Sequence, residues 1–490
     1  MDEKQDGLAG NIRRVGVATL LVALSFVASR LLGLARDMII ANLFGTSPQL
    51  DAYFAAFRLP DLVFQLLTGA VLGSAFIPTF ATYLVKHSRE EAWELASSVL
   101  NIIAAVTFAL AIILIIIAPW VVPLLFRTFS PESQRLTVEL SRIMLVSPIF
   151  FSVSGIITGI SQAHHRFLFP ALAPIFYNLS IIVAALTLGD HLGVRGLAIG
   201  VATGSLLHLL IQLPDLFRAG MVYRLVARIH HPAVREVARL MGPRVIGLAA
   251  SQGNFLVLTI MASTLASGSI AALNYGWVIM MMPLGIFGMA ISTALFPTMA
   301  QQAAAEGSRA LATTTSSGLR LILFFTIPAS VGLIILRRPL VALIFQRGLF
   351  SAESTHITSQ AVLFYSIGLF AHASIEILVR GFYSLHDTKS PVATAVAVMA
   401  MNIPLSLALK HVMGHAGLAL SVSLTTITEA GVLFFLLRRR LRTLDEPLLA
   451  TSLSRTCLAT LAMAGLLGLV RAVDGQTGLP PLTPAVVVLL

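Results

Sequence analysis

The sequence predicts an all-α polytopic membrane protein of two six-helix lobes, and three observations support this fold class. Apolar residues make up 57% of the 490-residue chain, charged residues make up 11%, and the mean hydropathy is +0.89. A soluble domain carries about 25% charged residues. Apolar stretches of about 18 or more residues, long enough to cross about 30 Å of hydrocarbon, recur along the whole chain. The third observation is a set of motifs that returns 219 to 221 residues later.

The apolar stretches predict about thirteen complete spans and a truncated fourteenth. The complete spans are expected near 15–36, 51–84, 94–118, 136–160, 169–188, 194–217, 240–264, 271–300, 317–336, 358–380, 391–409, 415–437 and 452–471. The last apolar run begins near Leu482 and stops at Leu490, which is too short to cross the hydrocarbon. We interpret it as a truncated fourteenth span, and a short re-entrant tail is the alternative.

Basic residues predict the orientation of these spans, because loops rich in Lys and Arg face the cytoplasm. A cytoplasmic N-terminus places most of the 33 basic residues inside. The 218–244 connection carries six arginines alternating with valine, leucine and isoleucine, interrupted only at Pro232. We expect it to form an amphipathic helix on the cytoplasmic surface.

Several classes of function are disfavoured by the same composition. The net charge of +11 could suggest nucleic-acid binding, but in so apolar a chain basic residues more often flank spans. The single Cys457 excludes a disulfide framework and a cysteine-based metal site. No HExxH, GxSxG or P-loop motif is present, so we expect neither an enzyme nor a bound metal or cofactor.

The internal repeat predicts two lobes of parallel orientation. GAVLGSAFIPT at 69–79 returns as GMAISTALFPT at 288–298, and the segment at Gly193 returns at Gly414. Each copy holds six spans, so the copies are related by a pseudo-two-fold axis along the membrane normal, and a substrate site is expected where they meet. A duplicated structural bundle without transport is the alternative. The expected parts are an N-terminal lobe at 1–217, the connection at 218–239, a C-terminal lobe at 240–437, and the last spans at 438–490.

Charged residues inside the first two spans are the strongest candidates for a functional site, because charges are costly within a membrane. Arg30 and Asp37 are seven residues apart, as are Asp51 and Arg58, so each pair shares a helix face about 10 Å along the axis. Together with Arg36, these residues suggest a site for an anionic substrate whose phosphate oxygens the arginines bind. Ordinary ion pairs or snorkelling side chains are the alternative, above all for Arg36 and Asp37.

Other polar residues in the spans give weaker signals. His208 and Glu429 occupy equivalent positions of the two copies and could form a proton or cation relay, with a structural hydrogen bond as the alternative. Asn402 could supply a ligand for a coupling cation, Na⁺ or H⁺. Spacings of three and four residues predict ion pairs within one helix. The pairs expected on this basis are Glu139–Arg142 and Glu376–Arg380.

The segments SRLLGLARDMIIANLFG and DAYFAAFRLPDL resemble the MurJ (MviN) family of lipid II flippases, of the multidrug/oligosaccharidyl-lipid/polysaccharide exporter superfamily. AFIPTF, ISQAHHRFLFPALAP, IFQRG and GFYSLHDTKSPV extend the resemblance over essentially the whole chain. It implies fourteen spans, two lobes, and a lipid-tail groove formed by the last two helices. It also implies that Arg30, Arg36 and Asp37 face the cavity that holds the pyrophosphate, that Asp51 lies near the outer gate, and that Arg58 occupies a basic position.

The resemblance implies a monomeric lipid II flippase of the bacterial inner membrane, active in peptidoglycan biosynthesis and cell-wall organization. Its partners would be membrane lipids and lipid II, an undecaprenyl-pyrophosphate-linked precursor moved from the inner to the outer leaflet. Two arginines of the family pattern are absent, after the LPDL segment and in the span at 271–300. A related polyprenyl-pyrophosphate-linked glycan is therefore an alternative substrate. A polysaccharide-lipid flippase or a cation-coupled drug exporter is the alternative function, followed by a membrane glycosyltransferase.

Overall fold

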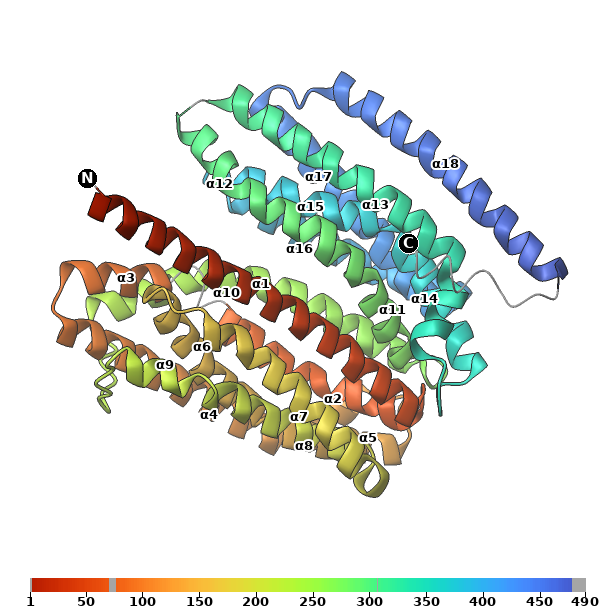
Figure 1. Cartoon of the computed structure of the whole chain (residues 1–490). Helices are drawn as coiled ribbons and strands as arrows, with labels where there is room; N and C mark the ends of the chain where they lie inside the picture. The colour runs from red at the N-terminus through yellow and green to blue at the C-terminus, as the bar shows by residue number, and fades with distance from the viewer. Residues whose placement is uncertain (1, 70–75, 306, 478–490) are drawn as a thin grey trace. The chain divides into compact units, whose positions relative to one another are not determined.

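The computed structural model describes residues 2–69, 76–305 and 307–477, and every regular element in these ranges is helical (Figure 1). The elements η1 and η3 are π-helices, and each continues the α-helix before it. The elements are α1 (Asp2–Phe44), α2 (Pro48–Phe64), η1 (Gln65–Gly69), α3 (Ile77–Lys86), α4 (Arg89–Leu125), α5 (Pro131–Met144), α6 (Ser147–Ala163), α7 (Leu168–Leu192), α8 (Val194–Leu210), α9 (Leu213–Arg218), α10 (Pro232–Ser263), α11 (Ser269–Pro283), η3 (Leu284–Met289), α12 (Ala290–Ala305), α13 (Ser308–Phe345), α14 (Ala352–Ile367), α15 (Leu369–Ser384), α16 (Lys389–Met413), α17 (His415–Leu441) and α18 (Glu446–Thr477).

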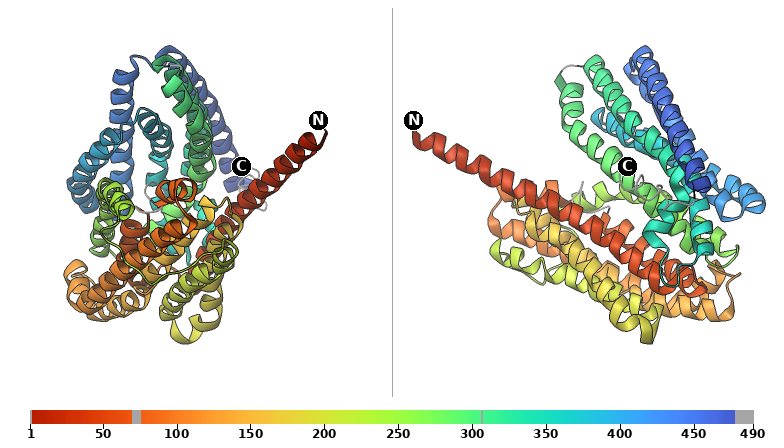
Figure 2. Two further views of the ribbon diagram at one scale, coloured as in Figure 1. Left: turned by 90° about the vertical axis from the view of Figure 1, so that its left-hand side faces the viewer. Right: turned by 45° about the vertical axis from the view of Figure 1, so that its right-hand side comes forward.

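The chain divides into two compact units. Unit 1 comprises Met1–Phe44 and Pro48–Gly253, and unit 2 comprises Gly45–Ser47 and Asn254–Leu490. The boundary between them therefore falls inside α10, whereas we expected a separate connection at 218–239. In unit 1, α1 packs along α7, and α7 packs along α8. Figure 2 shows the N-terminal part of α1 extending beyond the other helices of its unit.

Nine helical segments of the described ranges are long and apolar enough to cross a membrane. A tenth results if α14 and α15, which are bent by 43° at their junction, form one span. These ten coincide with ten of the thirteen expected spans. The other three, near 15–36, 51–84 and 240–264, are helical where the structure describes them but do not belong to this group, so the count of thirteen is not confirmed. Part of the 51–84 span and the expected fourteenth span lie outside the described residues.

The prediction of an amphipathic helix over 218–244 is wrong for the first half of that segment. Helix α9 ends at Arg218, and no helix forms between Gly220 and Pro232. The backbone there is bound from the side instead, because the Asn101 side-chain amide donates hydrogen bonds to the carbonyls of Arg224 (3.1 Å) and Val226 (2.9 Å). A side chain of α4 thus satisfies carbonyls that a helix would have satisfied internally.

The second half of this connection forms the first turns of α10. Pro232, which we took as a helix breaker, opens the helix, because a proline at the first helical position loses no intrahelical bond. Val234 and Val237 are buried in a cluster with Phe80 and Trp93 of α3 and α4. The apolar stripe of the connection therefore faces the protein.

Local backbone conformation confirms the internal repeat in each unit separately. Gly193 before α8 has φ 56° and ψ −138°, and Gly414 before α17 has φ 59° and ψ −136°. His165 and His386 follow α6 and α15 with φ of 56° and 57°. Because left-handed backbone is uncommon for residues other than glycine, its return at the same repeat position reflects a common local fold. The π-helices η1 and η3 also occupy corresponding positions.

The α7–α8 hairpin is held close by small residues. A Cβ atom added at Gly196 would lie 2.8 Å from the Cβ of Leu188, and one added at Gly200 would lie 2.7 Å from the Cβ of Ala184. Two apolar helices in a membrane gain attraction mainly through such close backbone approach. The hairpin therefore fixes α7, the helix that carries the polar partners of the α1 charges.

Candidate functional site

Arg36 and Asp37 of α1 form an ion pair inside unit 1. The Nε and Nη2 atoms of Arg36 donate to Oδ1 of Asp37 at 3.0 and 2.9 Å. Nη1 of Arg36 donates to Oδ1 of Asn178 on α7 at 3.0 Å. The Asn178 amide nitrogen in turn donates to the carbonyl of Pro174 at 3.0 Å. Asp37 is buried, so this network fixes both charges within the helix packing.

A second pair of charges lies on α2. The carboxylate of Asp61 interacts electrostatically with Arg58 and accepts a hydrogen bond from Gln65 at the start of η1. The sequence suggested Asp51 as the acid that shares a stripe with Arg58. A separation of three residues also brings side chains together on a helix, and it places Asp61 next to Arg58. Asp61 and Gln65 are thus site residues that the sequence reasoning missed.

Two tyrosines join these charge pairs. The phenol of Tyr177 on α7 lies within electrostatic range of Arg36, Asp37 and Asp61. The phenol of Tyr53 on α2 lies within the same range of Arg36, Asp37 and Tyr177. Residues from α1, α2, η1 and α7 therefore converge on one polar cluster, which we call the charge cluster. Its members are Arg36, Asp37, Tyr53, Arg58, Asp61, Gln65, Tyr177 and Asn178.

The remaining predicted residues of α1 and α2 are Arg30 and Asp51. Arg30 is exposed, and its guanidinium lies over the ring of Phe26, 5.1 Å from the centroid, one turn earlier on α1. Asp51 is buried in the first turn of α2. On the stripe that Arg30 was expected to share with Asp37, the carboxylate of Asp37 binds Arg36. An exposed Arg30 is the cation of this set that an incoming anion could reach first.

His208 belongs to a hydrogen-bonded network between α6 and α8. Its Nδ1 atom lies 2.7 Å from the hydroxyl of Ser154, and the hydroxyl of Thr158 donates to Oε1 of Gln212 at 2.7 Å. The Gln212 amide nitrogen donates to the His208 carbonyl at 3.0 Å. Phe151 contacts both the His208 ring and the Tyr177 ring, at centroid distances of 5.1 and 5.2 Å. The network thus borders the charge cluster through one aromatic ring.

The polar candidates of unit 2 have different surroundings. The Asn402 amide nitrogen donates to Oδ1 of Asn254 at 2.6 Å, and its own Oδ1 accepts from Ser406 at 3.2 Å. Glu429 on α17 is half-buried, and it makes no hydrogen bond or ion pair with any residue that the structure describes. His208 and Glu429 therefore differ in their bonding despite their equivalent positions. Their relay role, like the cation-ligand role of Asn402, stays a prediction.

One of the two expected ion pairs within a helix is present. Arg380 donates to Glu376 at 2.6 Å, as the four-residue spacing predicts. The prediction of a Glu139–Arg142 ion pair is wrong. Glu139 binds Arg195 of α8 through both carboxylate oxygens, at 2.8 and 2.9 Å, while Arg142 donates to the carbonyl of Ile115 at 3.0 Å. Arg195 of the neighbouring helix thus binds both carboxylate oxygens of Glu139, which is the stronger, two-bond form of such a pair.

Comparison with known proteins places this arrangement in a family. The family model described as lipid II flippase MurJ matches residues 40–487. The chain belongs to the MurJ family. MurJ relatives include the lipid II flippase MurJ of Burkholderia cenocepacia, which is 30% identical over 86% of this chain and 84% of its own length. A probable lipid II flippase MurJ of Thermotoga maritima is 31% identical over 91% of this chain and 89% of its own length.

Solved structures agree with the MurJ assignment. A lipid II flippase MurJ in an inward closed conformation aligns with a TM-score of 0.80 at 26% identity, covering 93% of each chain. An inward-facing multidrug resistance MATE family transporter of the MOP superfamily aligns with a TM-score of 0.72 at 16% identity, over 85% of this chain and 96% of that chain. The MATE transporter therefore shares the fold. Five of the eight members of the charge cluster lie in the α1 and α2 motifs that first suggested the MurJ family.

Proposed function

We propose that this protein is a lipid II flippase that moves the undecaprenyl-pyrophosphate-linked peptidoglycan precursor from the inner to the outer leaflet. Membership of the MurJ family supports the class of substrate. The observation that carries the site is the charge cluster of unit 1, where Arg36, Asp37 and Asn178 are hydrogen-bonded between two apolar helices. Buried charges of this kind in membrane helices mark substrate pathways.

The chemistry of the cluster suits a pyrophosphate that binds for a short time. Arg36 and Arg58 each lie beside a carboxylate, Asp37 and Asp61 respectively. A phosphate can replace a carboxylate as the partner of an arginine, because both offer oxygens in the same fork geometry. We infer that the head group exchanges with these carboxylates and that their return releases it. Arg30 supplies the exposed cation at which binding begins.

The proposal includes a location and a driving force. We place the protein in the bacterial inner membrane as a monomer with a cytoplasmic N-terminus, because the basic residues favour that side. The proposed transport uses no bound cofactor and forms no covalent bond. It is coupled to the membrane potential or to a cation, Na⁺ or H⁺, for which Glu429 and Asn402 are the candidate residues in unit 2. Alternating access of the charge cluster to the two leaflets completes the cycle.

Growth rescue tests this function. A bacterium depleted of its own lipid II flippase would be supplied with the full chain or with Arg36→Ala or Asp37→Ala variants. We expect rescue by the full chain and loss of rescue by both variants at equal membrane abundance. Arg438→Gln is the matched control, since it breaks an exposed ion pair with Glu446 in unit 2 and should leave rescue intact. Full rescue by both cluster variants would reject the site.

A drug-export function is distinguished by the same strains. The MATE structures share the fold, and a cation-coupled drug exporter would protect cells from toxic organic cations without restoring growth. We expect the opposite outcome, growth restored with no gain in drug resistance. Drug resistance without growth rescue would replace the proposed function.

A further inference from the structure

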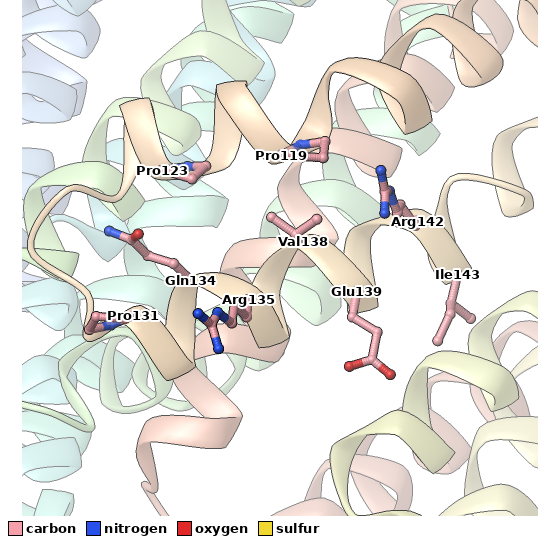
Figure 3. A pocket seen from close by; sticks show the side chains of 9 residues that line it. All are labelled: Pro119, Pro123, Pro131, Gln134, Arg135, Val138, Glu139, Arg142 and Ile143. Atoms are coloured by element: carbon pink, nitrogen blue, oxygen red, sulfur yellow. The ribbon is translucent and has the colours of Figure 1, made fainter.

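A pocket of about 730 Å³ lies in unit 1 where α4 ends and α5 begins, and no member of the charge cluster lines it (Figure 3). It is lined by Pro119 and Pro123 of α4 and by residues along almost the whole length of α5. The lining residues of α5 are Pro131, Gln134, Arg135, Val138, Glu139, Arg142 and Ile143. Neither the proposed transport nor the repeat accounts for this pocket.

Two arginines give the pocket a positive charge. Arg135 and Arg142 are seven residues apart on α5, so they lie on one side of the helix about 10 Å apart along its axis. Arg142 is held by a single bond from Nε to the Ile115 carbonyl, which leaves its two terminal amino groups for a ligand. Arg135 makes no hydrogen bond or ion pair within the described parts of the chain. The lining thus offers donors for an anion.

The acid between these arginines is already neutralised. Glu139 binds Arg195 of α8 through both carboxylate oxygens, and Arg195 is not one of the lining residues. Figure 3 shows the Glu139 carboxylate directed away from Pro119 and Pro123. The ion pair therefore cancels the only negative charge of the lining. Without Arg195, that carboxylate would repel an anion bound between Arg135 and Arg142.

The exposed apolar residues beside the pocket favour an amphiphilic ligand. Trp120 is 68% exposed, and Ile113 and Ile116 on the same helix are also exposed. An exposed tryptophan at the end of an apolar span is typical of the boundary between hydrocarbon and head groups. An acyl chain could lie along this face of α4 while its head group enters the pocket. A soluble anion would gain nothing from that face.

The second copy of the repeat carries different residues at two positions of the pocket lining. Arg338 occupies the position of Pro119, and His356 occupies the position of Arg135, at the repeat offsets of 219 and 221. The Nη2 atom of Arg338 lies 3.1 Å from Nδ1 of His356, so the two side chains bind each other. In the second copy a histidine bound to a neighbouring side chain therefore stands in place of the lining arginine Arg135.

We propose that this pocket binds the phosphodiester head group of an anionic membrane glycerophospholipid, such as phosphatidylglycerol, through Arg135 and Arg142. The orientation proposed above places it in the outer leaflet. The lipid would lie against α4 and α5, which belong to the same unit as the charge cluster. Binding of this lipid does not depend on lipid II transport. Lipid binding can therefore be measured on the purified full chain without a flippase assay.

Fluorescence quenching of Trp120 tests the proposal. The full chain in phosphatidylcholine nanodiscs would receive increasing fractions of brominated phosphatidylglycerol or of brominated phosphatidylcholine with the same acyl chains. The difference between the unmodified chain and Trp120→Phe isolates the signal of Trp120. We expect half-maximal quenching at a roughly 30-fold lower fraction of the anionic lipid, because two basic residues near the head group each contribute about fivefold. Equal quenching by the two lipids would overturn the proposal.

Four variants separate the proposed contacts from general attraction to charge. Arg135→Gln/Arg142→Gln should abolish the preference, and Arg135→Lys/Arg142→Lys should retain most of it. Arg127→Gln is the matched control, since Arg127 is an exposed arginine of the α4–α5 loop outside the lining, and it should change nothing. Arg195→Gln should weaken the preference although Arg195 does not line the pocket.

A double variant that removes the charges of both Glu139 and Arg195 gives the most decisive test. Adding Glu139→Gln to Arg195→Gln should recover the preference, because the carboxylate released by the first change is then removed. Failure of the double variant to recover, or an unchanged preference in the Arg135/Arg142 glutamine variant, would contradict the assignment. Glycerol phosphate at millimolar concentration should not compete. Full competition by it would show a soluble-anion site in place of a lipid site.

Discussion

Arg36 of α1 donates a hydrogen bond to Asn178 of α7 across 3.0 Å, and this bond ties the charged first helix to an otherwise apolar one. The same amide is anchored on α7 by its bond to the Pro174 carbonyl. Because Asp37 and Asn178 both bind the guanidinium of Arg36, the orientation of this group is fixed. The position of the cation is therefore set by a neutral residue 142 positions away in the sequence.

Asn178→Ala should weaken both stability and transport. The variant removes one charge-assisted bond of Arg36, so we expect a loss of about 1–3 kcal/mol in the free energy of unfolding and reduced growth rescue. Asn101→Ala is the control, because Asn101 binds the 221–229 segment outside the cluster. It should lower the unfolding temperature and leave rescue unchanged. Equal rescue by the two variants would speak against a role for Asn178 in positioning Arg36.

Asp61→Asn should impair rescue although it preserves the size of the side chain. The change removes the negative charge beside Arg58 and alters the bond from Gln65. We expect a stability loss of about 1–3 kcal/mol and a clear loss of rescue, with partial recovery in Asp61→Glu. Asp190→Asn, at the exposed end of α7, serves as the control and should behave like the unmodified chain.

Gly200→Ala should destabilise the α7–α8 hairpin. The added methyl group would lie 2.7 Å from the Cβ of Ala184 and 3.1 Å from the Cα of Ile181, so the helices must separate. We expect a loss of about 1–3 kcal/mol, measured by thermal unfolding in detergent. Gly332→Ala in α13 meets nothing within 4 Å and should stabilise the chain by about 0.5–1 kcal/mol. A neutral Gly200→Ala would contradict the close helix approach.

His164 should make stability depend on pH. Burial is the main cause that lowers the pKa of its imidazole, and the nearby charges of Arg166 and Arg89 lower the pKa further. The ring also stacks on Trp93, with centroids 5.6 Å apart. The unfolded chain therefore binds a proton more readily than the folded one. Stability is fully present above the unfolded pKa of about 6.5 and falls as the pH drops toward the folded pKa.

The variant His164→Gln tests this dependence. We expect the unmodified chain to lose more stability than the variant between pH 7 and pH 5, because the variant has no group to protonate at this position. Unfolding temperatures measured across that range give the difference. Parallel curves for the two proteins would show that His164 does not contribute.

Much of the fold followed from patterns that need no tertiary contact. Apolar length predicted the nine helical segments that are long and apolar enough to cross a membrane, and a tenth if α14 and α15 form one span. The repeat motifs predicted the shared backbone at Gly193 and Gly414, because a required left-handed conformation selects glycine wherever the repeat recurs. The Glu376–Arg380 pair was predictable for the same reason, since four residues span one helical turn.

The candidate site was predictable only in part. The charges of α1 and α2 stand out because they interrupt apolar helices, and Arg36, Asp37 and Arg58 all lie in the charge cluster. Their partners gave weaker signals. Asn178 is a single amide in an apolar span, and Tyr53 and Tyr177 resemble ordinary core aromatics. Periodicity also did not single out Asp61, because Asp51 and Asp61 are both spaced to share a helix face with Arg58.

The sequence by itself determined the helices, the repeat and the set of residues able to carry charge inside the membrane. These depend on hydropathy and on local backbone geometry, which act within a few residues. Only the tertiary structure decided the pairing of those charges. Glu139 binds Arg195 in preference to Arg142, and a side chain of α4 holds the segment before Pro232 in a non-helical form. In each case the partner is distant in the sequence. The packing of the helices decides which side chains come close enough to bind.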